Sequence, residues 1–320
     1  MTYHVLIPDQ VHPSALDVLK PVADIRFTAP GQMTRADLLA AVPDADALII
    51  RSASKVDAEI LNAAAKLKLI ARAGVGVDNV DVPTATARGV MVMNTPDGNT
   101  ISTAEHTFGL MLALARHIPQ GHQSMREGKW DRKSYMGVEL RGKTLGVVGF
   151  GRIGRAVAAR ALAFEMRVVA YDPYIPADYA AGLGVPLVSM ETLFAQSDFI
   201  TLHTLLTDET RNLVRAETIA TMKRGVRIID AARGALINEA DLADAIKSGQ
   251  VAGAALDVFV SEPPEAGNPL VGLAGVIHTP HLAASTEDAQ INVAVEAAQL
   301  IVDALTRGEY KNVVNPAAVK

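Results

Sequence analysis

Short apolar segments alternate with amphipathic ones along the first 95 residues, and this pattern predicts strands and helices in turn. The apolar segments are rich in Val, Ile, Leu and Ala, as expected of strands buried on both faces, whereas the others repeat their apolar positions at helical spacing. Such alternation predicts a parallel sheet covered by helices on both faces. The predicted strands are 4–8, 25–28, 47–51, 67–74 and 90–94, and the predicted helices are 13–20, 35–42, 57–64 and 83–88.

A segment dense in turn-forming residues, 94–100, separates this pattern from a second one. Residues 101–116 then predict a strongly apolar helix, which must be buried between domains or against another subunit. Residues 121–135 hold the only tryptophan, Trp130, among basic residues and predict a solvated loop. The second pattern predicts strands at 144–149, 167–171, 198–203, 226–230, 252–258 and 276–279, and helices at 152–164, 190–196, 216–222 and 239–248.

A last helix is predicted at 286–307, and no strand follows it. We infer that this helix returns to the first α/β unit and makes it discontinuous. The predicted fold is therefore α/β, with two doubly wound parallel-sheet domains, one inserted into the other. The expected domains are 1–98 with 285–320, and 99–284.

Three glycines follow the first strand of the second pattern, in Gly149-Phe-Gly151-Arg-Ile-Gly154. Such glycines can simply form a tight turn, but with a strand before and a helix after them they predict a dinucleotide site. Gly149 permits the turn, Gly151 lets the backbone approach a pyrophosphate, and Gly154 allows close packing of helix on strand. Asp172 ends the next strand, where a carboxylate binds the ribose hydroxyls and repels a 2′-phosphate, so NAD is favoured over NADP.

Composition excludes several other classes of protein. The 320 residues suffice for two domains, 49% are hydrophobic, and the net charge of −5 gives no general basic field for nucleic acid or an anionic membrane. No apolar run approaches the ~18 residues of a membrane span, and the first ten residues lead into a strand rather than a secretory signal. Without cysteine there is no thiolate zinc site, and no other metal site is expected. The sequence predicts a soluble, cytoplasmic protein.

Three polar side chains follow late strands of the second pattern. They are Arg233 in Asp230-Ala-Ala-Arg233-Gly, Glu262 in Phe259-Val-Ser-Glu262-Pro-Pro, and His281 in Thr279-Pro-His281-Leu-Ala-Ala-Ser. Taken singly, each has a simpler explanation: the histidine as a structural residue, the arginine as a solvent-exposed side chain, and the glutamate as the start of a turn. Ligands of such sheets bind at the carboxyl ends of the strands, which makes all three candidate site residues.

These motifs, with the glycine motif and Arg72-Ala-Gly-Val-Gly-Val-Asp-Asn79, resemble the D-isomer-specific 2-hydroxyacid dehydrogenases over nearly the whole chain. Loss of a hydride from C2 of a hydroxy acid must be matched by loss of the hydroxyl proton, for which imidazole is suited. The resemblance implies that His281 is this acid–base group. It implies that Glu262 binds the other ring nitrogen, and that Arg233 binds the substrate carboxylate and developing alkoxide.

The resemblance also implies a Rossmann NAD-binding domain at 99–284, inserted into a flavodoxin-like substrate domain. The implied NAD-binding positions are Gly149, Gly151, Arg152, Ile153, Gly154, Asp172, His203, Thr204, Ala231, Ala232, Asp257, Ala283 and Ala284. We interpret Gly74, Val75 and Gly76 as a backbone cradle for the substrate carboxylate, with an ordinary glycine-rich loop as the alternative. The resemblance implies that Arg51, Ser52 and Lys55 hold a 3-phosphate, joined by Arg132 of a neighbouring subunit.

The similarity is greatest to family members that oxidise 3-phospho-D-glycerate to 3-phosphooxypyruvate for serine biosynthesis. Asp230 and Ala235 depart from the Asn and Gly frequent in the family, and Val75 stands where Thr is common in those members. The open alternatives are another D-2-hydroxyacid dehydrogenase, such as a hydroxypyruvate/glyoxylate reductase or a sulfolactate-type enzyme, and a non-catalytic NAD-sensing protein like the corepressors of this fold. We expect a homodimer and, because the chain ends soon after the last helix, no C-terminal regulatory domain.

Overall fold

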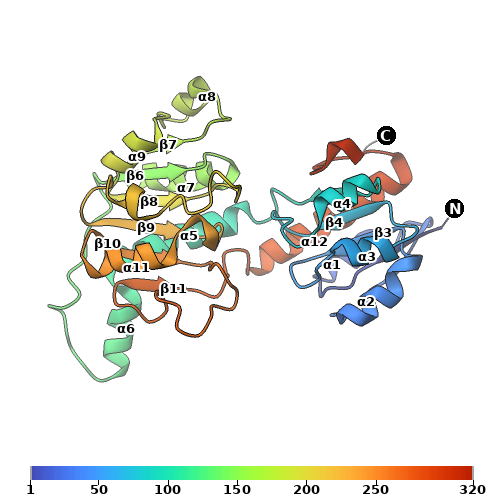
Figure 1. The fold of residues 1–320 in the computed structure, drawn as a ribbon, viewed down its shortest axis with the longest axis horizontal. Helices are drawn as coiled ribbons and strands as arrows, with labels where there is room; N and C mark the ends of the chain where they lie inside the picture. Colours follow the sequence, from blue (N-terminus) through green and yellow to red (C-terminus); the bar gives the residue numbers. More distant parts are fainter. Residues whose placement is uncertain (1, 319–320) are drawn as a thin grey trace. The chain divides into compact units, whose positions relative to one another are not determined.

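The computed structural model describes residues 2–318, and the chain forms two compact units (Figure 1). Unit 1 comprises Met1–Asn99 and Ser285–Lys320, and unit 2 comprises Thr100–Ala284. Both units are α/β structures built on parallel sheets, so the predicted fold class is confirmed.

Unit 1 contains a five-stranded parallel sheet of order β2-β1-β3-β4-β5. This is the flavodoxin-like order, in which the chain changes direction across the sheet between β1 and β3. The central strand β3 is buried along its whole length, as its four apolar residues require. The strands are β1 (Tyr3–Leu6), β2 (Ile25–Thr28), β3 (Ala47–Ile50), β4 (Leu69–Arg72) and β5 (Met91–Asn94).

Helices cover both faces of this sheet. One core joins the strands to α1 and α12, and the other joins them to α2, α3 and α4. Side chains of Thr34, Asp57 and Asp81 accept hydrogen bonds from first-turn backbone N–H groups, which fixes where α2, α3 and α4 begin. The helices are α1 (Ser14–Leu19), α2 (Arg35–Ala41), α3 (Ala58–Ala63), α4 (Val82–Ala87) and α12 (Glu287–Arg307), with short 3₁₀ turns η1 (Val42–Asp44) and η3 (Pro316–Ala318).

Unit 2 contains a six-stranded parallel sheet of order β11-β10-β9-β8-β6-β7. An isolated parallel bridge between Ala170 and Leu187 continues the sheet beyond β7. Counted with this bridge, the order is that of a Rossmann sheet, with the change of direction between β6 and β8. The strands are β6 (Thr144–Val148), β7 (Arg167–Tyr171), β8 (Phe199–Leu202), β9 (Val226–Asp230), β10 (Val251–Leu256) and β11 (Val276–His278).

Two cores again sandwich the sheet of unit 2. One contains residues of α5 and α7, and the other contains residues of α9, α10 and α11 (Figure 1). The helices are α5 (Thr100–Arg116), α6 (Ile118–Arg126), α7 (Arg152–Ala163), α8 (Ala177–Gly182), α9 (Met190–Gln196), α10 (Ala216–Ile219) and α11 (Glu239–Lys247), with the 3₁₀ turn η2 (Gly234–Leu236).

Three sequence expectations for unit 2 need correction. Helix α5 packs on α7 and β10 within its own unit, so its apolar face requires neither another domain nor another subunit. The expected loop 121–135 begins inside α6, a mostly exposed helix whose buried residue is Ser124 and whose sequence has few apolar residues. Helix α10 ends at Ile219 rather than 222, and residues 220–222 form turns.

Among residues 2–318, no helix has the length and apolar character needed to cross a membrane. The same part of the chain brings together no group of three potential metal-binding side chains.

Candidate functional site

The NAD-binding positions expected from the sequence all follow strands of unit 2. In a parallel sheet these strand ends share one edge, which is where ligands bind. The glycine loop follows β6 and His203 follows β8, so these two segments flank the point where the sheet changes direction. The full set of expected NAD-binding positions lies after β6 (Gly149, Gly151, Arg152, Ile153, Gly154), β7 (Asp172), β8 (His203, Thr204), β9 (Ala231, Ala232), β10 (Asp257) and β11 (Ala283, Ala284).

The glycine loop has the geometry of a phosphate cradle. Gly149 has φ 89°, and a Cβ there would lie 2.5 Å from the carbonyl oxygen of His203. A Cβ on Gly154 would lie 2.1 Å from the carbonyl oxygen of Gly149, whereas one on Gly151 would meet nothing within 4 Å. The first and third glycines therefore allow close internal packing, and the second leaves an open approach to the start of the 12-residue helix α7.

Asp172 and His203, two of the expected NAD-binding positions, are both fixed by internal hydrogen bonds. Asp172 accepts hydrogen bonds from the backbone N–H groups of Phe150 (2.8 Å) and Tyr174 (2.9 Å), so its carboxylate is fixed beside the glycine loop. Burial lowers the pKa of His203 to about 3, and its Nε2 lies 2.9 Å from Thr201 Oγ1, which makes it a neutral, structurally bonded imidazole. An open phosphate cradle beside a fixed carboxylate fits NAD.

His281 and Glu262 form a hydrogen-bonded pair, with His281 Nδ1 2.6 Å from Glu262 Oε2. The bond to Glu262 raises the pKa of His281, although partial burial and the charge of Arg233 oppose the rise. Burial by itself raises the pKa of Glu262, but the bond from His281 and that ring's charge, with the Phe259 N–H, lower it overall. The His281 side chain is 52% exposed, so its ring is accessible to a ligand.

Arg233 stands at the start of η2, directly after β9. A Cβ on Gly234 would lie 2.0 Å from the backbone carbonyl carbon of Phe259, so this glycine lets the two loops pack and sets the position of Arg233. Arg233 Nη1 donates to the carbonyl of Ala232 at 2.7 Å. The structure thus joins His281 and Glu262 directly and places Arg233 near enough for its charge to act on His281.

Asp257, one of the implied NAD-binding positions, is held by several hydrogen bonds. Its carboxylate is buried and accepts from the backbone N–H groups of Leu282 (2.7 Å) and Ala283 (2.8 Å) and from Thr279 Oγ1. His106 Nε2 lies 3.2 Å from the same carboxylate. Burial would raise the pKa of Asp257, but these bonds, that from His106 first, lower it.

His106 is a residue that sequence reasoning missed. It lies on α5, which the sequence presents as an apolar helix buried in a core. The sequence feature that could have identified His106 is its polarity, because an imidazole in an apolar, buried helix needs a hydrogen-bond partner. Which partner it has depends on β10, about 150 residues further along the chain.

Asp230 ends β9 beneath this cluster and is fully buried. Its Oδ1 accepts from the N–H of Ala232 at 2.8 Å, and its Oδ2 has no partner among the described residues. Burial raises the pKa of Asp230 to about 7, against the bonds from Ala232 and Arg233, and the charge of Asp257 adds to the rise.

The substrate positions expected in unit 1 lie after β3 and β4. Asp9 accepts from the N–H groups of Arg51 (2.5 Å) and Ser54 (3.3 Å) and from Ser54 Oγ (2.6 Å). Asn79 Nδ2 donates to the carbonyls of Arg51 (2.7 Å) and Ser54 (2.6 Å), so both sides of this loop are held. Ser52 and Lys55 are exposed on the same loop.

The glycine-rich loop after β4 is also fixed. Gly74 donates its N–H to Thr95 Oγ1 at 2.7 Å, and Asn94 Nδ2 donates to the carbonyl of Val75 at 2.6 Å. A Cβ on Gly74 would lie 1.6 Å from Arg72 Nη1, so the guanidinium packs against this loop. Gly76 follows in the same loop, whereas Arg132 is exposed in unit 2, beyond α6.

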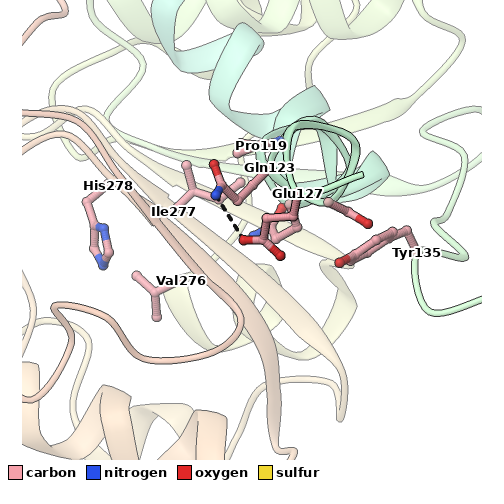
Figure 2. A pocket seen from close by; sticks show the side chains of 9 residues that line it. Pro119, Gln123, Glu127, Tyr135, Val276, Ile277 and His278 are labelled. Carbon is pink, nitrogen blue, oxygen red and sulfur yellow. Dashed lines mark hydrogen bonds between the residues drawn. The ribbon is translucent and has the colours of Figure 1, made fainter. Parts of the chain in front are cut away.

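A cavity of about 420 Å³ lies between α6 and β11 in unit 2 (Figure 2). Gln123, Glu127 and Tyr135 line it from one side and His278 from the other, and Gln123 Nε2 donates to Glu127 at 2.9 Å. It contains none of Arg233, Glu262 and His281, and we do not assign the hydride-transfer chemistry to it.

Comparison with known proteins identifies the family. Residues 108–283, more than half of the chain, match the family described as "D-isomer specific 2-hydroxyacid dehydrogenase, NAD binding domain". The chain belongs to this family. Unit 2 is thus its NAD-binding domain, and the predicted NAD cofactor and family resemblance are confirmed.

Several curated relatives of this family member are named D-3-phosphoglycerate dehydrogenase. The protein of Archaeoglobus fulgidus is 48% identical over 99% of this chain and 60% of its own length, and that of Mycobacterium bovis is 51% identical over 96% and 57%. This chain therefore spans about three fifths of the length of these relatives.

Solved structures of similar fold cover both chains almost completely. The TT0316 protein from Thermus thermophilus is 37% identical, with a TM-score of 0.88 over 97% of this chain and 99% of that one. A glyoxylate reductase from Paecilomyes thermophila is 29% identical, with a TM-score of 0.89 over 98% of each chain.

The two packed glycines and the open one give a first prediction for this family member. Gly154→Ala is expected to destabilise the cofactor-free protein by about 1–3 kcal/mol, because its Cβ would overlap the Gly149 carbonyl. Gly151→Ala should leave the melting temperature unchanged but weaken NAD binding by about tenfold or more, because its methyl group obstructs the pyrophosphate. Calorimetric unfolding and NAD titration measure both, and normal NAD affinity in Gly151→Ala would contradict the cradle assignment.

Proposed function

We propose that this protein is an NAD-dependent dehydrogenase that oxidises 3-phospho-D-glycerate to 3-phosphooxypyruvate in the cytoplasm, for serine biosynthesis. The observation that carries the proposal is the His281–Glu262 pair, with Arg233 nearby, on the edge of the sheet that bears the NAD loop. Relatives named D-3-phosphoglycerate dehydrogenase, about half identical to this chain, support the substrate.

The roles of the three residues follow from their protonation. Neutral His281 removes the proton of the C2 hydroxyl through Nε2, because Nδ1 is bonded to Glu262. Glu262 stabilises the imidazolium that results, and Arg233 holds the substrate carboxylate and the developing carbonyl oxygen. NAD, when bound by the glycine loop and Asp172, supplies the acceptor for the hydride of C2.

In unit 1 we propose two substrate-binding loops. Backbone N–H groups at Gly74, Val75 and Gly76 bind the carboxylate, and Arg51, Ser52 and Lys55 bind the phosphate. The bonds of Asp9 and Asn79 to the second loop support this, because a fixed loop binds an anion without first losing conformational entropy. We further propose that Arg132 of a second copy joins the phosphate.

The second candidate is a dehydrogenase of an unphosphorylated or sulfonated 2-hydroxy acid. The similarity to a glyoxylate reductase over 98% of each chain favours it, as does Val75 in the proposed carboxylate cradle. Neither feature concerns the His281–Glu262 pair. The two candidate functions therefore share their chemistry and differ only in how the substrate loop binds the acid.

A substrate panel tests the proposed function. Purified protein with NAD should oxidise 3-phospho-D-glycerate with kcat/KM at least about tenfold above that for D-glycerate, because the phosphate adds charged hydrogen bonds. NADH formation is measured by absorbance with each hydroxy acid, and NADH consumption is measured with hydroxypyruvate, glyoxylate and sulfopyruvate. Turnover of the unphosphorylated or sulfonated acids alone would select the second candidate. NAD binding with no hydride transfer to any acid would instead identify a non-catalytic sensor.

The raised pKa of His281 sets the pH dependence. The His281 pKa lies above the usual 6.5. Oxidation requires the neutral ring, so kcat/KM for oxidation should rise as pH increases through this pKa. Reduction requires the imidazolium, so kcat/KM for reduction should fall over the same range. Glu262→Gln removes the main cause of the shift. Both profiles should therefore move to lower pH, and kcat should fall by about 10²-fold or more. An unmoved profile, measured in steady-state assays from pH 5 to 10, would contradict the role of Glu262.

We also propose that the protein is a homodimer. The support is a run of exposed apolar side chains on α6 and the segment after it, with Trp130 75% and Met136 84% exposed. Sedimentation velocity should give twice the chain mass of 33.8 kDa. Trp130→Ser with Met136→Ser should weaken association by about tenfold or more, and Leu183→Ser, an exposed control in the same unit, should not. A wild-type monomer would refute the proposal.

A further inference from the structure

Asp257 makes most of the hydrogen bonds that hold the short segment carrying His281. The backbone carbonyl of Asp257 accepts the N–H of His281 at 2.8 Å. Its carboxylate accepts the N–H groups of Leu282 and Ala283, and the Thr279 hydroxyl. Four of the five residues from 279 to 283 are thus bonded to this one residue, which we call the Asp257 clamp.

His281 needs such a clamp because its backbone is strained. Its φ is 54°, in the left-handed region that side chains with a Cβ rarely adopt. Residues in such conformations persist only where their surroundings determine them. The clamp therefore decides where the His281 ring points and whether it meets Glu262.

His106 closes the clamp from helix α5. Its Nε2 lies 3.2 Å from Asp257 Oδ1 and 3.0 Å from Thr279 Oγ1. The Thr279 hydroxyl gives its proton to Asp257, and a carboxylate only accepts, so His106 Nε2 must carry a proton and donate it to this pair. The His106 bond is also the first of those that keep Asp257 ionised despite its burial.

We propose that His106 is a positioning residue for His281, acting through Asp257 and Thr279. This inference rests on the proposed function of His281 as acid–base group. The ring of His106 bonds to Asp257 and Thr279 rather than to His281 itself, so its loss should loosen the 279–283 segment without removing a group from the reaction. A looser segment weakens the His281–Glu262 bond, which is the main support of the His281 protonated form.

The charged groups that act on His281 are Glu262, Asp257 and Arg233. Glu262 and Asp257 favour the protonated ring, and Arg233 opposes it. Removing the His106 donor leaves Glu262 and Arg233 unchanged and acts on His281 only through Asp257 and Thr279. A shift of the His281 titration in a His106 variant therefore reports a change at the Asp257 clamp.

The test compares His106→Phe, which removes the donor but keeps a planar ring, with His106→Gln, whose Nε2 can donate from a similar position. In His106→Phe, kcat should fall by about ten- to a hundredfold and the His281-dependent limb should move to lower pH. His106→Gln should restore most of kcat and the position of the limb. Glu105→Gln, an exposed neighbour on α5 that pairs with Arg160, is the matched control and should behave as wild type.

A second measurement requires no turnover. The His281 ring is titrated by NMR in cofactor-free protein, and its pKa should fall toward the ordinary value in His106→Phe but not in His106→Gln. An unchanged His281 titration in His106→Phe would overturn the inference, as would an equal loss of kcat in His106→Phe and His106→Gln. Failure of the proposed function would appear separately, as a wild-type protein that titrates as expected but transfers no hydride.

Discussion

The site depends on keeping one carboxylate ionised inside the protein. A buried charge is stable only where hydrogen-bond donors replace the water it has lost. Asp257 finds its donors in His106 and in three residues of the segment 279–283. Most of these donors belong to one short segment. The hydrogen bonds that the buried carboxylate requires therefore fix the path of that segment and, with it, the strained backbone of His281.

The rest of the site follows from the direction of the strands. All six strands of unit 2 are parallel, so polar residues from distant parts of the sequence emerge along one edge. Close packing of the loops between them is possible only at glycine, as at Gly149 against His203 and Gly234 against Phe259. Glycines at this edge therefore have two effects: Gly151 leaves the approach to α7 open, and the others let neighbouring loops pack closely.

Much of this arrangement could be predicted from local sequence. The strand, glycine loop and helix around Gly151 are contiguous, so each element helps to predict the next, and the Arg233, Glu262 and His281 motifs follow strands. The bonds of His106 and Asp257 could not be predicted, because they join an apolar helix to a strand end 151 residues away. Helix α6 was missed for a different reason, since it is mostly exposed and its sequence contains a proline, a glycine and few apolar residues.

A comparison with Asp230 shows how hydrogen-bond donors keep the pKa of the buried Asp257 low. The two carboxyl groups follow neighbouring strands, and the N–H of Asp257 donates to the carbonyl of Asp230 at 2.8 Å. Asp257 has side-chain donors as well as backbone ones, whereas the Asp230 carboxylate is stabilised by the backbone N–H groups of Ala232 and Arg233. Burial therefore lifts the Asp230 pKa to about 7, while that of Asp257 stays low.

This difference separates the ionisation of two adjacent acids, in the way that paired carboxyl groups in active sites are separated. Asp257 stays ionised, whereas burial favours the protonated, neutral form of its neighbour Asp230. An asparagine at this position would be neutral at every pH. The aspartate therefore places a carboxyl group whose pKa is raised by burial in the surroundings of Arg233, the residue proposed to hold the substrate carboxylate.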